Sequence, residues 1–332
     1  MTAVVHLVWG PLGTAPLTRF LDSYRRHPAG LEHELVMLLN NVDERQRDEV
    51  VSALDGLDYH LLALERPVQD LAAYFFAAEQ LEHERLCFLN SYSELLAPEW
   101  LAKLANALEF PRAGIVGACG SWASLRSATL NALFLPNAYR GVIPPRRVAR
   151  VQVREMAVEL DREREADEHA GEGPPSEIPT TLRRRLAEGL GPALRTLPTM
   201  PGQVVRFQGF PNAHMRTNAF MASRRTLIGI RRDGIESKMD AYLLESGRNS
   251  LTRQIQRQGL RALVVDSEGT SFEEIRWARS RTLWQGDQEL LLVADNQTRI
   301  YARGSLERRR LLSVFAWGRQ AEAGPALVKS GE

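Results

Sequence analysis

The sequence predicts an α/β fold: a mainly parallel central sheet with helices on both faces and a helical insertion. Three observations favour this class. Short apolar runs alternate with helix-like periodicity across residues 1–120. Hydrophobic residues make up 44% of the chain and charged residues 25%, which is typical of globular proteins. Strand signals fade and charges crowd between about 144 and 201, and order then returns, which indicates an insertion.

The strands of the first part are short apolar runs that end at turn-forming residues. The run 4–9 ends at Gly10-Pro11-Leu12-Gly13, and the run 35–39 ends at Asn40-Asn41. Apolar residues recur at helical spacing between the runs, and Asp43 opens one of these helices. This alternation predicts parallel strands, whose carboxyl ends gather ligands. The remaining strands of this part are expected at 59–64, 85–89 and 115–117.

The second part begins with a strand-like segment at 215–222. Ser237 and Asp240 form a capping box for a helix that ends at Gly247. Asn249 or Ser250 caps the next helix. Later strands are expected at 263–265 and 290–294, and the insertion is expected to hold an amphipathic helix at 181–197.

Composition excludes several classes of protein. Lys and Arg number 42 against 41 Asp and Glu, so the net charge of +1 does not favour a nucleic-acid partner. The cysteines are Cys87 and Cys119, too few for a disulfide framework or a zinc cluster. No apolar run approaches the length of a membrane span, and Met1 leads directly into a strand without a signal peptide. A cytoplasmic location is expected.

Familiar nucleotide and nucleophile motifs are missing from the sequence. The first strand is not followed by G-x-G-x-x-G, and neither G-x-x-x-x-G-K-[ST] nor G-x-S-x-G occurs. These absences disfavour a classical dehydrogenase, a P-loop nucleotidase and an α/β-hydrolase. The remaining signals are polar clusters where strands end, such as Asn40-Asn41-Val42-Asp43 and Asn90-Ser91-Tyr92-Ser93-Glu94, the latter followed by Pro98-Glu99-Trp100-Leu101.

This arrangement resembles the GT-A fold glycosyltransferases, especially bacterial family-2-like members, over residues 3–125 and more loosely over 205–302. The resemblance implies a half-Rossmann sheet that binds a nucleotide sugar at the ends of its first strands. It divides the chain into a nucleotide-sugar-binding half (1–125), a helical insertion or lid (126–205), an acceptor and catalytic half (206–305) and a C-terminal helix and tail (306–332). The nucleotide-sugar contacts that it implies are Pro11, Leu12, Asn40, Asn41, Asp70, Tyr74, Asn90, Ser91, Tyr92 and Ser93.

In that family an Asp-x-Asp motif after the fourth strand holds a divalent metal on the sugar diphosphate. This chain has Asn90 and Tyr92 at those places, although a hard cation prefers several charged oxygens. If Mn²⁺ or Mg²⁺ binds, Glu94 or His214 is the expected ligand. Otherwise an arginine must stabilise the departing diphosphate, and Arg216 and Arg303 are candidates. Residues 90–93 are also compatible with a simple capped turn.

The resemblance also implies a carboxylate base if the enzyme inverts the anomeric centre of the sugar. Inversion is favoured over retention. Glu245, just upstream of the helix that leads to 263–265, resembles that base, and Asp240 is the alternative. Both acids also have structural readings, as a surface acid and as half of a capping box. Contacts to the sugar or the acceptor are expected from Trp122, His214, Arg216, Asn218, Trp284, Asp287 and Gln288.

The function that follows is transfer of a sugar from a nucleotide diphosphate sugar to a hydroxyl, in bacterial glycan or polysaccharide biosynthesis. The acceptor is a glycan or a lipid-linked saccharide. Basic runs at 183–185 and 308–310, the second followed by apolar residues of an interfacial helix, allow peripheral contact with the inner membrane face. The alternatives are a catalytically degenerate nucleotide-sugar-binding module and, less favoured, a nucleotidyltransferase, which normally has a basic residue in the first glycine-rich loop.

Overall fold

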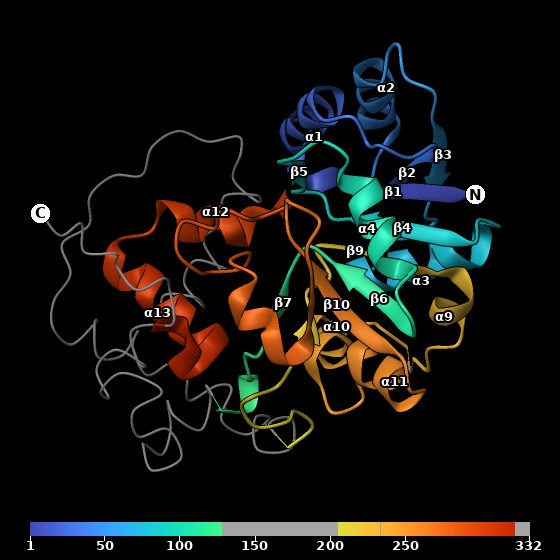
Figure 1. Cartoon of the computed structure of the whole chain (residues 1–332). Helices are drawn as coiled ribbons and strands as arrows, with labels where there is room; N and C mark the ends of the chain where they lie inside the picture. Colours follow the sequence, from blue (N-terminus) through green and yellow to red (C-terminus); the bar gives the residue numbers. More distant parts are fainter. Residues whose placement is uncertain (128–204, 233, 323–332) are drawn as a thin grey trace, which may run out of the picture.

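A computed structural model describes residues 1–127, 205–232 and 234–322 (Figure 1). It confirms the α/β class, because one eight-stranded sheet forms the centre of the molecule. In spatial order its strands are β11 (Ser271–Glu273), β10 (Arg261–Val265), β6 (Ala113–Gly117), β9 (Ala219–Ser223), β4 (Arg85–Leu89), β1 (Thr2–Trp9), β2 (Glu34–Asn40) and β3 (His60–Ala63).

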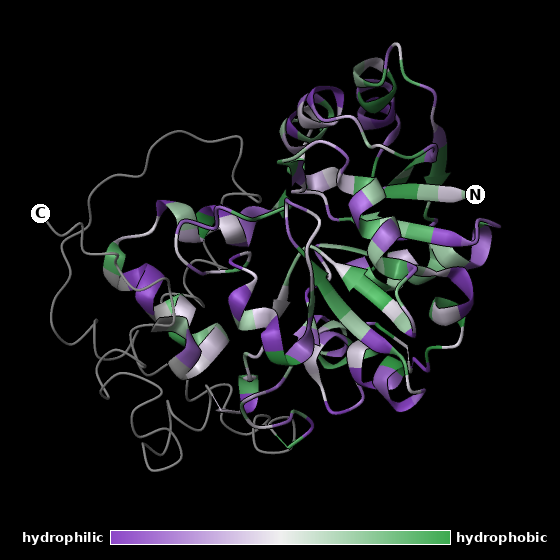
Figure 2. Ribbon diagram, in the orientation of Figure 1, coloured by the Kyte–Doolittle hydropathy of each residue, from purple (hydrophilic) through white to green (hydrophobic). Residues whose placement is uncertain are grey.

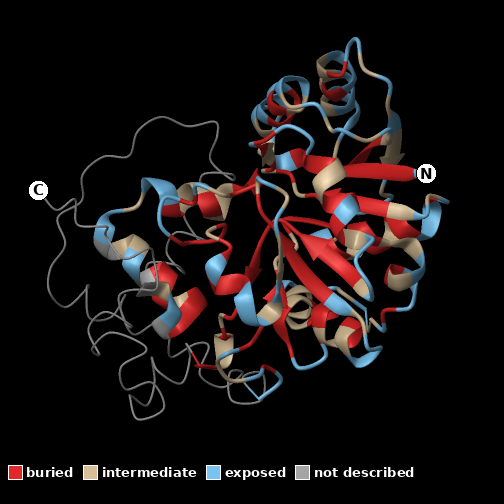
Figure 3. Ribbon diagram, viewed as in Figure 1, coloured by how far each residue is buried: buried red, intermediate tan, exposed pale blue. Residues whose placement is uncertain are grey.

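Most neighbours in this sheet are parallel. The pairs β1–β2, β1–β4, β2–β3 and β6–β10 run parallel, whereas β9 is antiparallel to β4 and β6, and β11 is antiparallel to β10. The central strands are buried along nearly their whole length, and Figures 2 and 3 show them as hydrophobic and buried. Continuous apolar runs of this kind form because layers on both faces cover a mainly parallel sheet.

Helices cover both faces of the sheet (Figure 1). On one face α1 (Ala15–Arg26) packs on β1, and α4 (Trp100–Leu108) packs on β6, β9 and β10. On the other face α3 (Asp70–Gln80) packs on β1 and β2 and contacts α10 (Lys238–Ser246), which is followed by α11 (Leu251–Arg257). Shorter helices extend these layers: α2 (Glu44–Ala53) lies against α1, and α9 (Arg224–Ile228) against α3.

Helix starts agree with the sequence expectations. Asp43 caps α2 by accepting a hydrogen bond from the backbone N–H of Gln46, 2.8 Å away. Ser237 and Asp240 form the expected capping box of α10, which Gly247 follows. Of the two candidates for the start of α11, Ser250 is the N-cap. These signals were readable because a cap depends on only a few neighbouring residues.

Two small antiparallel sheets lie beside the main one. β5 (Glu94–Leu95) pairs with β12 (Val293–Ala294), so only the end of the expected strand 290–294 forms. β7 (Gly120–Ser121) pairs with β8 (His214–Met215). The expected strand 215–222 is therefore two strands, β8 and β9, which belong to different sheets.

Hydrogen bonds beside β7 and β8 hold together the two flanks of the insertion. The Ser124 hydroxyl donates to the carbonyl of Gln208 at 2.6 Å, and the backbone N–H of Phe210 donates to the hydroxyl of Ser127 at 2.8 Å. The chain therefore leaves the fold and returns to it at one place. The expected helix at 181–197 and nearly all of the insertion 126–205 lie outside the described residues.

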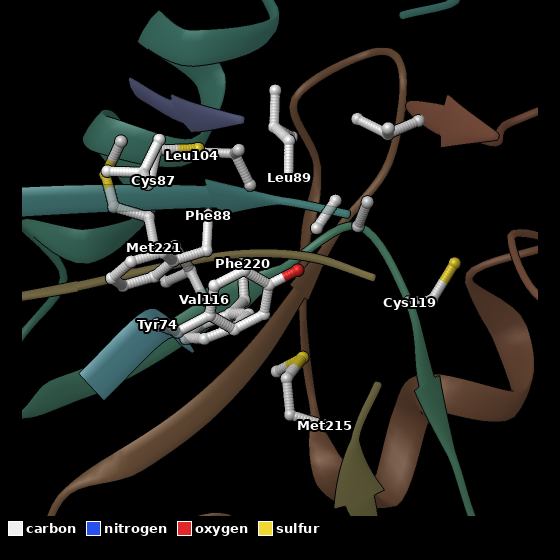
Figure 4. Packing of buried hydrophobic residues seen from close by; sticks show 14 of the residues in the cluster. Tyr74, Cys87, Phe88, Leu89, Leu104, Val116, Cys119, Met215, Phe220 and Met221 are labelled. Atoms are coloured by element: carbon white, nitrogen blue, oxygen red, sulfur yellow. The ribbon is translucent and has the colours of Figure 1, made fainter. Parts of the chain in front are cut away.

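An aromatic cluster joins α3 to the middle of the sheet (Figure 4). The ring of Tyr74 lies 4.8 Å from that of Phe88 and 5.8 Å from that of Phe220, and the last two rings are 5.2 Å apart. Tyr74 is 2% exposed, and its buried hydroxyl has no hydrogen-bond partner among the described residues. The side chain of Tyr74, which was predicted to contact the nucleotide, instead packs in the core, because α3 turns it onto the sheet.

The far end of the chain forms α12 (Asn296–Arg303), α13 (Leu306–Trp317) and η4 (Gly318–Glu322), while η3 (Glu274–Arg279) follows β11. The apolar residues expected to make α13 interfacial are largely used inside the protein. Leu312 is 5% exposed and Trp317 1%. These side chains are thus not free to enter a membrane surface. Among the described residues, no helix has the length and apolar character that crossing a membrane requires.

His6 supplies a test of how the core responds to acid. It is buried in β1 and stacks on Phe20 with ring centroids 3.8 Å apart, and its Nδ1 has no partner among the described groups. Burial lowers the pKa of His6 from 6.5 to about 3. Below pH 6.5, His6 is therefore protonated in the unfolded chain but stays neutral in the folded chain. The free energy of unfolding falls as the pH drops from 6.5 toward 3.

We expect His6→Leu to reduce this acid sensitivity. Between pH 7 and pH 5 the wild type should lose about 2 kcal/mol more of its free energy of unfolding than the variant. Urea denaturation at each pH measures the difference, and the matching change at exposed His60, His60→Leu, is the control. Equal pH dependence in wild type and His6→Leu would contradict the burial argument.

Candidate active site

The carboxyl ends of β1, β2, β4 and β6 meet at one edge of the sheet, as Trp9 beside Asn40 illustrates. The 3-10 turn η1 (Gly10–Leu12) follows β1 at this edge. Antiparallel β9 starts at the same edge, so Asn218 stands next to the end of β4, and its carbonyl accepts the backbone N–H of Asn90 at 2.9 Å. Segments on both sides of the insertion are thereby brought together at this edge.

The segment after β4 is a hydrogen-bonded turn. The Asn90 side-chain oxygen accepts the backbone N–H of Tyr92 at 3.0 Å and the hydroxyl of Ser93 at 3.1 Å. Ser93 is fully buried and Ser91 is 7% exposed, whereas Asn90 and Tyr92 are half-buried. The capped-turn reading of 90–93 is confirmed. A ligand at this turn would meet Asn90 and Tyr92 rather than the two serines.

Arg299, from α12, holds the same turn from the other side. Its guanidinium donates to the carbonyl of Tyr92 at 2.9 Å and forms an ion pair with Glu94 at 3.2 Å. Burial, and after it the positive charge of Arg19, lowers the pKa of Arg299. The sequence analysis missed Arg299, although its place one helical turn before Arg303 was a readable sign that both share a face of α12.

The donor atoms at this turn do not suit a divalent metal. The Asn90 oxygen already accepts hydrogen bonds inside the turn, and the carboxylate of Glu94 is paired with Arg299. His214, the other expected ligand, is 2% exposed, and its Nδ1 lies 2.8 Å from the carbonyl of Asn212. Throughout 1–127, 205–232 and 234–322, no three His, Cys, Asp or Glu residues gather into a possible metal site. Hard cations require more charged oxygens than this turn offers.

Glu245 lies in the last turn of α10, and its carboxylate is held by the segment between β8 and β9. One oxygen accepts the backbone N–H and the hydroxyl of Thr217, each at 3.2 Å, and Arg216 lies 3.7 Å away. Burial by itself raises the pKa of Glu245, but Arg216, His214 and the Thr217 hydrogen bonds outweigh it, so the net shift is downward. The side chain is 11% exposed. Glu245 is therefore a shielded carboxylate that stays ionised at neutral pH.

Asp70 is the second carboxylate near this position. It is the first residue of α3 and is exposed, yet protein atoms crowd it. This desolvation raises the pKa of Asp70; Lys238 opposes the shift and the charge of Glu245 adds to it. The net pKa shifts of Asp70 and Glu245 therefore run in opposite directions.

The side chains of two other predicted contact residues are buried and bonded inside the protein. Asn40 is buried, and its amide exchanges two hydrogen bonds with the backbone of Val68, at 2.8 and 3.1 Å. Trp122 packs edge-on against Trp317 and donates to the carbonyl of Glu274 at 3.2 Å. These side chains shape the protein around the site, and neither is free to contact a ligand as predicted.

The side chains of the segment around Trp284, which was expected to contact the sugar, are likewise bonded to other parts of the protein. Trp284 donates to the carbonyl of Gln297 at 3.2 Å, and the side chain of Gln288 joins the backbones of Trp284 and Thr298. Asp287 is exposed and pairs with Arg309. These contacts hold 284–288 as a turn, and sugar recognition by its side chains stays a prediction.

The remaining predicted residues differ in accessibility. Asp240 is at the surface in its capping box, and Ser237 lowers its pKa, so it has a complete structural role. Pro11 and Asn41 are exposed at the carboxyl edge, and Leu12 beside them is half-buried. Asn218 is buried, and its side-chain oxygen has no hydrogen-bond partner among the described residues. An unsatisfied buried oxygen next to the site is compatible with a ligand that donates to it.

Comparison with known proteins gives partial structural matches. No family model and no curated protein matches the sequence. TarS 1–349 of S. aureus is 16% identical over 35% of this chain and 34% of its own, with a TM-score of 0.29. A mannosyltransferase of Pyrobaculum calidifontis, solved with GDP-Man and Mn²⁺, is 17% identical over 36% and 34%, with a TM-score of 0.30. GalNAc-T7, solved with UDP, GalNAc and Mn²⁺, is 20% identical over 35% and 22%, with a TM-score of 0.30.

This chain spans about a third or less of the length of each of the three. The α/β assignment accordingly rests on the sheet order and strand directions described above.

Proposed function

We propose that this chain is a glycosyltransferase that moves a sugar from a nucleoside diphosphate sugar to a hydroxyl of a glycan or a lipid-linked saccharide. The observation that carries the proposal is the shielded, ionised carboxylate of Glu245, held beside Arg216 at the carboxyl edge of the sheet. Sugar transfer to a hydroxyl needs a base for the acceptor proton and a cation for the departing diphosphate.

In this proposal each part of the edge has its own task. The loop after β1 and the exposed Asn41 and Asp70 surround the nucleotide, and Asn90 with Tyr92 meets the diphosphate and the sugar. Glu245 accepts the proton of the acceptor hydroxyl as the new bond forms on the opposite face of the sugar, which inverts the anomeric centre. Because the pKa of Glu245 is lowered, its carboxylate is in the ionised form that can accept a proton at neutral pH. The proposal includes the division of the chain into a nucleotide-sugar-binding half (1–125), an insertion (126–205), an acceptor and catalytic half (206–305) and a C-terminal part (306–332).

A diphosphate would also change the surroundings of Glu245. The guanidinium of Arg216 is paired with Glu245 across 3.7 Å and is partly exposed. An incoming anion competes with Glu245 for this guanidinium. Any movement of Arg216 toward the phosphate raises the basicity of Glu245 when the donor is bound. The ion pair therefore suits an order in which the donor binds before the acceptor.

One observation favours the second candidate, a binding module without catalysis. The turn after β4 carries Asn90 and Tyr92 and is braced by Arg299. Such a turn can still hold a nucleotide sugar. Binding without turnover of the donor distinguishes this candidate from the enzyme.

Thermal unfolding with UDP, GDP, dTDP, CDP and their sugars tests the proposal. We expect at least one nucleotide to raise the melting temperature, because a ligand at a hundred times its Kd stabilises the native state by about 2.7 kcal/mol. The matching nucleotide sugar should then release its nucleoside diphosphate when saccharide acceptors are added. Binding without release would favour the binding module, and no stabilisation by any nucleotide would refute the proposal.

A further inference from the structure

We propose that this chain binds the diphosphate of its donor without a divalent cation, and that Arg299 with Arg19 and Arg303 supplies the positive charge instead. This inference rests on the proposed function and concerns how the same site holds its substrate. The turn after β4 is the place where the family that the sequence resembles has a metal-binding motif.

The guanidinium of Arg299 already uses the oxygens on which a cation at this turn would depend. It takes the carbonyl of Tyr92 at 2.9 Å and the carboxylate of Glu94 at 3.2 Å. Glu94 is the acid of this turn, because its other side chains are amide, hydroxyl and phenol groups. A divalent ion would have to displace an arginine that is 17% exposed and bonded twice. The residues present therefore fit an internal organic cation better than a metal.

Further positive charge stands close to this guanidinium. Arg303 follows Arg299 by one helical turn on α12, and Arg19 comes from α1, which packs against β5. Both arginines are exposed, and both act on Arg299 as like charges. On the opposing side are Glu94 and Asp295, and Asp295 is engaged in capping α12. The three arginines outnumber these two acids, so the arrangement favours an anionic ligand.

Arginine suits this task chemically. A guanidinium offers a planar fork of N–H donors that matches two phosphate oxygens, and it stays charged at any physiological pH. The hydrogen bond from Arg299 to the carbonyl of Tyr92, which does not depend on Glu94, fixes the orientation of the guanidinium. The turn therefore positions a cation that is ready before the ligand arrives.

Calorimetric titration with the nucleoside diphosphate that stabilises the protein tests the inference. We expect the same Kd in EDTA and in Mn²⁺. Dialysis against Mn²⁺ followed by elemental analysis should find no stoichiometric metal, with or without nucleotide. Arg299→Gln should weaken binding at least about tenfold, because it removes a charge-assisted contact. Arg261→Gln is the matched control, since Arg261 also pairs with a glutamate but lies at the opposite edge of the sheet.

Glu94→Gln separates a binding role of Arg299 from a structural one. If Arg299 binds phosphate, this variant frees the guanidinium, and the nucleotide should bind as tightly as before or more tightly. If Arg299 only braces the turn, Glu94→Gln should weaken binding as Arg299→Gln does, and the inference fails. Melting temperatures of both variants report whether the fold is intact, and Arg299→Lys should retain part of the affinity.

The outcomes also separate this inference from the proposed function. Nucleotide binding that requires Mn²⁺, or that Glu94→Gln abolishes, would overturn the arginine site and leave the transferase proposal standing. Absence of nucleotide binding under all conditions would overturn both.

Discussion

Replacing Glu245 by Gln is expected to lower the rate of sugar transfer by about 10²- to 10⁴-fold, the usual contribution of a general base. The amide cannot accept the acceptor proton, but it can still accept the hydrogen bonds of Thr217 that hold Glu245 in place. Nucleotide affinity should change little by comparison. Release of nucleoside diphosphate from the donor measures the rate, and calorimetry measures the binding.

Two further variants make this test specific. Glu82→Gln removes an exposed acid that precedes β4, at the far edge of the sheet, and should leave the rate unchanged. Asp240→Asn tests the alternative base; if Asp240 only caps α10, the variant should lose about 1 kcal/mol of stability and keep its rate. A Glu245→Gln protein that folds and transfers sugar at the wild-type rate would exclude Glu245 as the base.

The second large effect is expected at Gly10, where β1 ends. A Cβ atom here would lie 1.9 Å from the carbonyl oxygen of Asn41 and 2.7 Å from the side-chain oxygen of Gln46. The backbone oxygen of Asn41 cannot rotate away, so the loop after β1 must shift. We expect Gly10→Ala to reduce the free energy of unfolding by about 3 kcal/mol, as measured by urea denaturation.

Other glycines provide controls for this substitution. Gly229 has φ −72°, and a Cβ there would meet only ordinary contacts from 3.4 Å, so Gly229→Ala should be neutral or slightly stabilising. Gly13 has open space around it but φ +63° and ψ −159°, a conformation that essentially only glycine adopts, so Gly13→Ala should cost about 2 kcal/mol from backbone strain alone. A cost for Gly10→Ala no larger than that for Gly13→Ala would contradict the predicted contact with Asn41.

Local signals in the sequence were sufficient for much of the fold. The apolar run at 4–9 and the caps Asp43 and Ser237 were located correctly, and Ser250 was one of the two candidates for the third cap. Each depends on residues a few positions apart, so one sequence carries the whole pattern. The segment 215–222 was misjudged because its polar residues Arg216, Thr217 and Asn218 were taken as part of one strand, whereas they separate two strands. Its division into β8 and β9 depends on pairing with β7 in one case and with β4 and β6 in the other.

The candidate site was harder to predict because its contacts join distant parts of the chain. Arg299 and Tyr92 are separated by 207 residues, and no local pattern connects them. Asn40 was expected to face a ligand because it ends a strand. The backbone of Val68, which occupies both ends of its amide, could not be located from the sequence. Residue type and strand position thus predicted the edge of the sheet at which these polar residues gather, but not which of their side chains remain available there.

The paired flanks of the insertion have a consequence for how this fold can vary. Because Ser124 and Ser127 already join the two flanks, much of the entropy lost in closing the long loop is compensated outside it. Each doubling of loop length adds only about 0.6 kcal/mol to the closure cost. The sheet therefore tolerates inserts of very different lengths at this point.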